Sequence, residues 1–260
     1  IVHMVLARSP DGPEGIKGLS LFVVPKFLPD ADGNPGARND LRCVSLEHKM
    51  GMHASPTAVM SYGDDGGAQA FLIGEENRGI EYMFIMMNAA RLAVGMEGVG
   101  IAERAYQQAR DFAKDRVQSR ALTGGGADPV TIIHHPDVRR MLLAMRVQTE
   151  AIRAIAYRVA GAVDISRRHA DPEERARAQG FIDLMTPVAK AFSTDVASEV
   201  ADLGIQVHGG MGYIEETGAA QHARDIRVAR IYEGTNGIQA NDLVGRKVAR
   251  DEGIAAGELI

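Results

Sequence analysis

The chain has 260 residues, of which 45% are hydrophobic and 24% charged, so it can bury a core that forms one or two domains. Its formal net charge of −5 at pH 7 provides no basic surface, which argues against nucleic acid as a partner. One cysteine, Cys43, excludes an intramolecular disulfide and indicates a reducing compartment.

The opening segment IVHMVLARSP has no cationic start and no cleavage site, so we do not expect a signal peptide. It lacks an initiator Met and begins inside a predicted strand, which indicates a piece of a longer chain. No apolar run is long enough to cross a bilayer, and no membrane span is expected. Cys43 lies in LRCVSL, where strand-like alternation and the lack of an adjacent base favour a buried structural thiol over a nucleophile.

Residues 1–75 are expected to form strands. The apolar runs IVHMVLA, GLSLFVVP and TAVMSY alternate with stretches rich in Gly, Pro, Asn and Asp, a pattern typical of β-hairpins and meanders. The segment HKMGMHASP is expected to be a loop between two strands.

From about Gly74 onward the pattern is helical. A first helix runs to the end of QQARDFAKDR and is followed by a break at SRALTGGGADP. A second helix begins at about Pro136, and its apolar positions have the alternating spacing of three and four residues typical of a packed bundle helix. These positions are Val138, Met141, Met145, Gln148, Ile152, Ile155, Val159 and Ala162.

A third helix is expected to begin at Asp171-Pro172, an N-cap followed by a proline at the first helical position. Pro187 is expected to kink or split it. Its core-facing residues are predicted to be Phe181, Met185, Val188, Phe192, Val196 and Leu203. After the irregular segments HGGMGY and EGTNG, a last helix is expected from about Gly237 to Arg250. The chain is thus predicted to be mainly α, with the end of a β-domain (1–75) followed by an antiparallel helical bundle (76–260).

Several stretches are candidates for chemistry, and each also has a structural explanation. The glycines of QVHGGMGY can present N–H groups to an anion, or can simply end a helix. His208 in this segment is either catalytic or a packing residue. The segment DRVQSR has two cations, Arg116 and Arg120. The helix dipole favours cations near a helix C-terminus whatever their function. Arg91 is an isolated cation in an apolar helix and needs a partner, by default a salt bridge.

The segment RIYEGTNGIQ places a carboxylate, Glu233, in a turn edged by glycine, where an unused charge would be costly. Metal chemistry finds no support, because His134 and His135 are adjacent and the chain contains no HExxH or CxxC spacing.

Together these segments resemble the acyl-CoA dehydrogenase family. The segments GLSLFVVPK and EHKMGMHASPTAVMSY resemble the last strands of the family's β-barrel-like middle domain, and LIGEENRGIEYMFIMMNAARLAVG resembles the start of its C-terminal domain. QVHGGMGY resembles the family's glycine turn, and RDIRVARIYEGTNGIQ resembles the segment with its catalytic glutamate. The spacings Arg91 to Arg116 (116 − 91 = 25) and Gln206 to Glu233 (233 − 206 = 27) agree with the family.

The resemblance implies a role for each matching residue. Glu233 falls on the base that removes the α-proton of an acyl-CoA thioester, while Gly234, Tyr232 and Arg91 are implied to help hold substrate and base. Thr235, Arg116 and Gln118 fall on positions that contact FAD. Gln206, Gly209 and Gly210 fall on the turn that holds the ADP portion of FAD. The contacts of Arg116 and of the glycine turn are implied to reach the flavin of a neighbouring subunit.

The implied activity is FAD-dependent α,β-dehydrogenation of an acyl-CoA to the trans-2-enoyl-CoA, with hydride passing to flavin N5. The implied partners are an acyl-CoA substrate, an acceptor of the electron-transfer flavoprotein type, and further copies of the chain in a homodimer or homotetramer. The insertion Leu122–His135 and the polar stretch near Arg167–Arg177 resemble a larger bacterial branch, which includes enzymes of 3-(methylthio)propanoyl-CoA. The resemblance also implies a location in the bacterial cytoplasm.

Two departures and two alternatives accompany the resemblance. Gly237 stands where most members have Gln, and Gln118-Ser119-Arg120 replaces the usual Phe-Gly. The same fold also serves acyl-CoA oxidases and other superfamily members. Alternatively, the chain is a non-catalytic helical assembly fragment in which Glu233 and the glycines are structural.

Overall fold

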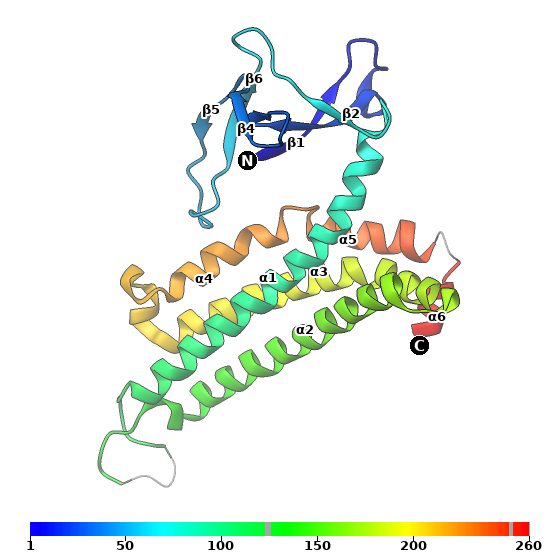
Figure 1. Ribbon diagram of the computed structural model, residues 1–260. Coiled ribbons are helices and arrows are strands. Elements are labelled where there is room, and N and C mark those ends of the chain that lie inside the picture. Colours follow the sequence, from blue (N-terminus) through cyan, green and yellow to red (C-terminus); the bar gives the residue numbers. More distant parts are fainter. Residues whose placement is uncertain (123–125, 250–251, 260) are drawn as a thin grey trace. The chain divides into compact units, whose positions relative to one another are not determined.

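The computed structural model describes residues 1–122, 126–249 and 252–259 (Figure 1). Its contacts divide the chain into two compact units, Ile1–Ala89 and Ala90–Ile260. The change from strands to helices falls between the last strand, which ends at Ile73, and the first long helix, which begins at Gly79. The domain division at residues 75 and 76 stays a prediction.

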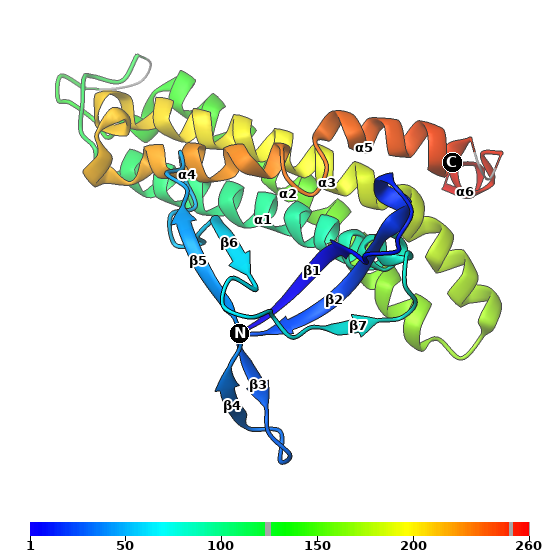
Figure 2. The same cartoon turned by 90° about the horizontal axis from the view of Figure 1, so that it is seen from above.

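The first unit contains three small antiparallel sheets, visible in Figure 2. One sheet has the strand order β1-β2-β7, and the other two are the pairs β3-β4 and β5-β6. The predicted strands and the predicted loop between LRCVSL and TAVMSY are confirmed. The strands are β1 (Val2–Arg8), β2 (Leu19–Pro25), β3 (Phe27–Pro29), β4 (Pro35–Arg38), β5 (Leu41–Leu46), β6 (Ala58–Tyr62) and β7 (Phe71–Ile73), with a 3-10 turn η1 (Gly15–Gly18).

The prediction that Cys43 is buried is wrong. Cys43 is exposed, and Leu41 is the one buried residue of β5. Alternation along a strand says which side chains share a face, but burial requires a second layer over that face. β5 pairs only with β6 in a two-stranded sheet, and the register of the pair shifts between Cys43 and Ser45.

Helix α1 (Gly79–Asp115) begins in the first unit, and its residues from Ala90 onward belong to the second. Small residues let it approach α3 closely: a Cβ at Gly98 would lie 2.8 Å from the carbonyl oxygen of Ser193. By length and composition alone α1 is apolar enough to cross a membrane, contrary to the expectation from the sequence. Core helices of bundles share this composition, and Val94 and Val99 of α1 are buried in the core of the second unit.

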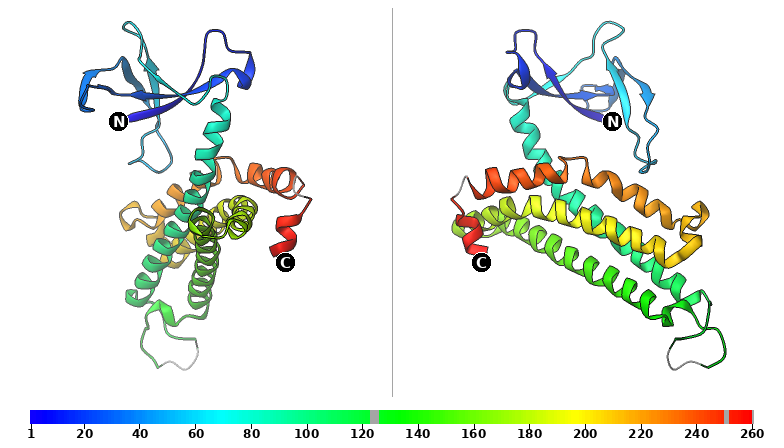
Figure 3. Two further views of the ribbon diagram at one scale, coloured as in Figure 1. Left: turned by 45° about the vertical axis from the view of Figure 1, so that its right-hand side comes forward. Right: turned by 180° about the vertical axis from the view of Figure 1, so that it is seen from behind.

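Helices α2 (Pro136–Arg168) and α3 (Pro172–His208) pack side by side and antiparallel (Figure 3). Both predicted starts are confirmed, and the Asp171 carboxylate accepts a hydrogen bond from the Glu173 backbone N–H at 2.9 Å. Every predicted seam position of α2 is buried or half-buried. The helical assignment of α3 continues through Pro187, so the predicted split is absent from this described helix.

Phe192 was predicted to face the core and is instead 46% exposed. The buried stripe of α3 carries small side chains at this level, Ser193, Thr194 and Ala197 among them, because α1 approaches α3 here. The hydrophobic core of the second unit joins α1, α2 and α3 with residues of the segments that follow, such as Ile226.

Short elements complete the second unit. The predicted last helix begins at Asn236 and changes to π-helical geometry at Leu243, and its predicted end at Arg250 lies outside the described residues. The elements are η2 (Ile132–His134), η3 (Gly209–Tyr213), η4 (Glu215–Thr217), α4 (Ala219–Ile226), η5 (Arg227–Arg230), α5 (Asn236–Asp242), η6 (Leu243–Val248) and α6 (Ile254–Leu259).

Candidate active site

Glu233 and Gly234 form a tight turn between η5 and α5. Both residues have positive φ, 53° at Glu233 and 85° at Gly234. A Cβ at position 234 would lie 2.8 Å from the Gln239 Nε2 atom, so the turn requires glycine there. A glutamate in the left-handed region is uncommon and is retained where the surroundings fix it.

Three side chains from three helices hold the two carbonyl groups of this turn. Arg91 Nε on α1 donates to the Glu233 carbonyl at 3.3 Å. Gln239 Nε2 on α5 donates to the Glu233 carbonyl at 3.2 Å and to the Gly234 carbonyl at 3.1 Å. Lys190 Nζ on α3 donates to the Gly234 carbonyl at 2.8 Å. The turn is therefore anchored through its backbone, which leaves the Glu233 side chain available.

Arg91 has the salt-bridge partner that its isolated position requires. Its Nη1 atom lies 2.9 Å from Asp242 Oδ2, and the two residues are 3% and 6% exposed. Breaking such a buried pair would leave an uncompensated charge inside the bundle. The pair thus fixes the guanidinium group that also binds the Glu233 carbonyl.

The Glu233 carboxylate is half-buried and forms no hydrogen bond or ion pair with the residues that the structure describes. The hydroxyl of its neighbour Tyr232 donates a hydrogen bond to the Glu97 carboxylate. Burial, and then Glu97, raise the pKa of the Tyr232 phenol, so this side chain stays neutral at physiological pH. Tyr232 is thus bonded to Glu97, whereas the adjacent Glu233 carboxylate is available to bind a ligand.

Lys190 was not among the candidates from the sequence. It is fully buried on α3, and its ammonium group also donates to Asn236 Oδ1 at 3.0 Å. The available signal was a lysine on the helix face that otherwise carries Thr194, Ala197 and Ala201, all of them buried. A lysine on such a face needs internal acceptors.

Thr235 is an exposed residue whose side chain caps α5. Its Oγ1 atom accepts a hydrogen bond from the Ile238 backbone N–H at 3.3 Å. The geometry explains Thr235 as an N-cap, and its exposure is compatible with a contact to a ligand.

The candidate residues for the dinucleotide gather at the other end of the helices, where α1 and α3 finish. All of them are exposed: Arg116, Gln118, Gln206, Gly209 and Gly210. The two helix ends are joined by contact of the Phe112 and His208 rings, whose centroids lie 4.4 Å apart.

His208 is buried, and its Nδ1 atom lies 2.7 Å from the Gly204 carbonyl oxygen. The structure thus favours the packing interpretation of this residue. Among the described residues, no group of three His, Cys, Asp or Glu side chains could hold a metal ion.

One chain places the Glu233 turn and the glycine turn far apart. Arg91 contacts the Glu233 turn, and Arg116 follows the last residue of the same helix. Their separation of 25 residues (116 − 91) corresponds to about 37 Å at a rise of ~1.5 Å per residue. The Glu233 turn and the glycine turn therefore lie near opposite ends of this stretch of α1.

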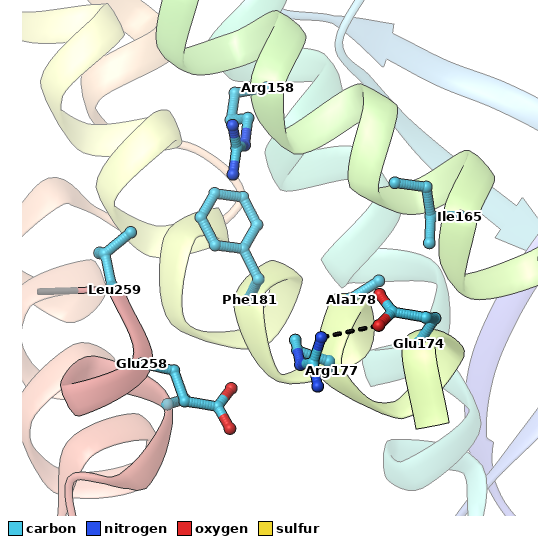
Figure 4. Close-up of a pocket in the computed structure, with 9 residues that line it drawn as sticks. Arg158, Ile165, Glu174, Arg177, Ala178, Phe181, Glu258 and Leu259 are labelled. Carbon is cyan, nitrogen blue, oxygen red and sulfur yellow. Dashed lines mark hydrogen bonds and ion pairs between the residues drawn. The ribbon is translucent and has the colours of Figure 1, made fainter. Parts of the chain in front are cut away.

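A cavity of about 270 Å³ lies between α2, α3 and α6 (Figure 4). The Arg158 guanidinium lies over the Phe181 ring, 5.4 Å from its centroid, and Arg177 pairs with Glu174 at 2.7 Å. None of the candidate site residues lines this cavity.

Comparisons with known proteins converge on one group of enzymes. The sequence profile of "Acyl-CoA dehydrogenase, C-terminal domain" matches residues 77–248. The chain is 59% identical over 256 residues to 3-methylmercaptopropionyl-CoA dehydrogenase of Ruegeria pomeroyi, covering 98% of this chain and 43% of that protein. It is 39% identical over 258 residues to a butyryl-CoA dehydrogenase of Syntrophomonas wolfei, covering 97% and 42%.

Among solved structures, Caenorhabditis elegans ACDH-11 in complex with C11-CoA superposes with a TM-score of 0.82 at 30% identity. This match covers 99% of the present chain and 41% of that chain. The present chain therefore spans about two fifths of the length of these relatives.

Proposed function

The chain belongs to the acyl-CoA dehydrogenase family, and we propose that it carries the catalytic base and part of the flavin site of an enzyme that oxidises an acyl-CoA thioester. The observation that carries the proposal is the Glu233–Gly234 turn. Its backbone is fixed by donors from three helices, while its carboxylate forms no hydrogen bond or ion pair with the described residues.

In this proposal Glu233 removes a proton from the α-carbon of the thioester. The electron pair of the broken C–H bond forms the α,β double bond, and a hydride leaves the β-carbon. When bound, FAD supplies the acceptor for that hydride. The α-hydrogen is a very weak acid, so the base must be held close to it and must lose water as substrate binds. The neighbours Ile231 and Ile238 are 51% and 48% exposed, and an acyl chain that covers them would desolvate the carboxylate and strengthen it as a base.

The exposed cluster of Arg116, Gln118, Gln206, Gly209 and Gly210 fits the anionic and adenine end of FAD. A guanidinium group is suited to phosphate oxygens, and glycines let the backbone of a turn approach a ligand closely. In the proposal Thr235, which is exposed beside Glu233, contacts the flavin end.

Since about 37 Å separates the two groups in one chain, we propose that each flavin site combines residues of two copies of the protein. This supports a homodimer or homotetramer. An electron-transfer flavoprotein is the acceptor class that we propose, with the cytoplasm as the location.

The substrate class is proposed from the relatives. The name of the relative at 59% identity points to 3-methylmercaptopropionyl-CoA, and that of the relative at 39% identity points to butyryl-CoA. A short acyl-CoA, with or without a thioether sulfur in place of a methylene group, is the first class to test.

The test uses the full-length protein, purified with its flavin, and an artificial electron acceptor. We expect Glu233→Gln to retain FAD but to lose turnover by about 10²–10⁴-fold, the contribution typical of a general base. Glu150→Gln is the control, because Glu150 is exposed and pairs with Arg146 on the surface of α2. Undiminished turnover in Glu233→Gln would remove this residue from the role. Hydrogen peroxide formation without an added acceptor would indicate an oxidase, and absence of flavin would favour the non-catalytic alternative.

A further inference from the structure

Lys190 is fully buried in the second unit, with an exposed fraction of 0%, and has the largest side chain among the fully buried residues of the described chain. A lysine ammonium group carries three N–H donors and is rarely buried without acceptors. Its acceptors therefore identify the part of the molecule that it holds.

The Gly234 carbonyl and the Asn236 side chain, which accept from Lys190, lie at the turn that carries Glu233. Lys190 Nζ donates to the Gly234 carbonyl at 2.8 Å and to Asn236 Oδ1 at 3.0 Å. Gly234 directly follows Glu233, and Asn236 is the first residue of α5. One side chain of α3 thus spans the segment from the candidate base to the next helix.

The orientation of the Asn236 amide is set by α3 as well. Its Nδ2 atom donates to the Ala191 carbonyl at 3.2 Å and to Thr194 Oγ1 at 3.0 Å. The Thr194 hydroxyl in turn donates to the Lys190 carbonyl at 2.9 Å. These bonds direct the amide oxygen of Asn236 at the Lys190 ammonium group.

The charge of Lys190 is balanced by groups on several elements. Burial lowers the pKa of Lys190 to about 8, and Arg91 on α1 lowers it as well. Asp195 on α3 and Glu233 in the turn act in the opposite direction. The ammonium form therefore predominates at neutral pH and is lost at moderately alkaline pH.

We propose that Lys190 is a positioning residue for Glu233: its ammonium group holds the Gly234 carbonyl and the Asn236 amide against α3 and thereby aims the Glu233 carboxylate. The inference rests on the proposed function, in which Glu233 is the base. Arg91 and Gln239 hold the Glu233 carbonyl independently of Lys190. The chain can therefore keep its fold without the Lys190 contact and still present the base loosely.

The kinetic test compares Lys190→Met and Lys190→Gln in the full-length, flavin-loaded protein. Met removes both the N–H donor and the positive charge. Gln removes the charge but keeps an N–H donor. A displacement of the base by about 1 Å can reduce the rate by ~10²-fold, so we expect kcat to fall by about that factor in Lys190→Met. KM and flavin content should change little. The control is Thr149→Val, a buried position whose hydroxyl donates to the Met145 carbonyl of its own helix.

Two further readouts report on the turn itself. Hydrogen–deuterium exchange of peptides covering residues 232–239 should be faster in Lys190→Met than in wild type, and unchanged in Thr149→Val. In wild type, kcat should fall as the pH rises through about 8, while in both Lys190 variants this alkaline decline should be absent. Deprotonation of Lys190 would not unfold the protein over this range. Above pH 8 the unfolded chain binds more protons at this lysine than the folded chain, so the contribution of Lys190 to the free energy of unfolding increases with pH.

Three outcomes separate this inference from the proposed function. Wild-type kcat in both Lys190 variants, with Glu233→Gln inactive, overturns the role of Lys190 and leaves the proposed function intact. A parallel loss of kcat, flavin and thermal stability also overturns it, because Lys190 is then needed for folding alone. Wild-type turnover in Glu233→Gln overturns the proposed function itself.

Discussion

Replacing Gly234 by Ala tests whether the geometry of the Glu233 turn is as constrained as its contacts indicate. Gly234 has φ of 85°, where a side chain with Cβ costs about 1–2 kcal/mol. The new Cβ would also lie 2.8 Å from Gln239 Nε2, and Gln239 is 1% exposed, so its amide cannot move out into water.

The expected loss of stability follows from these two contributions. Displacing the Gln239 amide weakens its hydrogen bonds to the Glu233 and Gly234 carbonyls, each worth about 0.5–1.5 kcal/mol net. Together with the backbone cost, Gly234→Ala should destabilise the helical unit by about 2–4 kcal/mol.

Gly237→Ala is the matched control, three residues further along. Its Cβ would have Thr235 Oγ1 at 3.9 Å as its nearest neighbour, and Gly237 lies in the first turn of α5 without a positive φ. Alanine in a helix is favoured over glycine, so this variant should be stabilised by up to ~1 kcal/mol.

Thermal unfolding of the full-length protein, followed by circular dichroism, should therefore give opposite shifts for the two variants. Turnover should fall in Gly234→Ala and remain near wild type in Gly237→Ala. Equal melting temperatures, with equal turnover, would refute the argument that the contacts of Gly234 fix the turn.

Three further predictions concern the surroundings of the turn and the glycine cluster. Asp242→Ala should cost about 3–5 kcal/mol in thermal unfolding, because it removes the buried carboxylate that lies 2.9 Å from the Arg91 guanidinium; an exposed pair would lose far less. Tyr232→Phe should lower the free energy of unfolding by about 1 kcal/mol at neutral pH, because the hydrogen bond to Glu97 is lost. The pKa of Tyr232 is raised in the folded state, so this stabilisation is present only while the phenol keeps its proton, and the difference from wild type should shrink as the pH rises above ~10. Arg116→Gln should lower the flavin content after dialysis at high salt without lowering the melting temperature of the flavin-free protein, since Arg116 is exposed; equal flavin retention would exclude a flavin contact.

The sequence predicted best the features that depend on local chemistry. The spacing from Val138 to Ala162 identified the buried face of α2, and Asp171-Pro172 identified the start of α3. The positive φ of Glu233 and Gly234 agrees with the glycine-edged turn expected there. In each case the signal lies within a few residues of the feature that it predicts.

Features that depend on which elements meet in space were missed or mispredicted. Cys43 and Phe192 are apolar positions in regular elements, yet both are exposed because no other described element covers them. Lys190 and Gln239 were missed because their importance comes from the meeting of α3, α5 and the turn, not from a local pattern. The helix α4 and the π-helical geometry of η6 were likewise too short or irregular for a periodicity to reveal.

The most direct test of Glu233 as the base is a single-turnover experiment without oxygen. Full-length protein carrying oxidised flavin is mixed with 3-methylmercaptopropionyl-CoA or butyryl-CoA, each unlabelled or deuterated at the α-carbon, and loss of the oxidised flavin absorbance is followed in time. We predict that deuterium slows flavin reduction in wild type and that Glu233→Gln, loaded with the same amount of flavin, shows no reduction on this timescale. Flavin reduction by Glu233→Gln at the wild-type rate would contradict the assignment of Glu233 as the group that takes the α-proton.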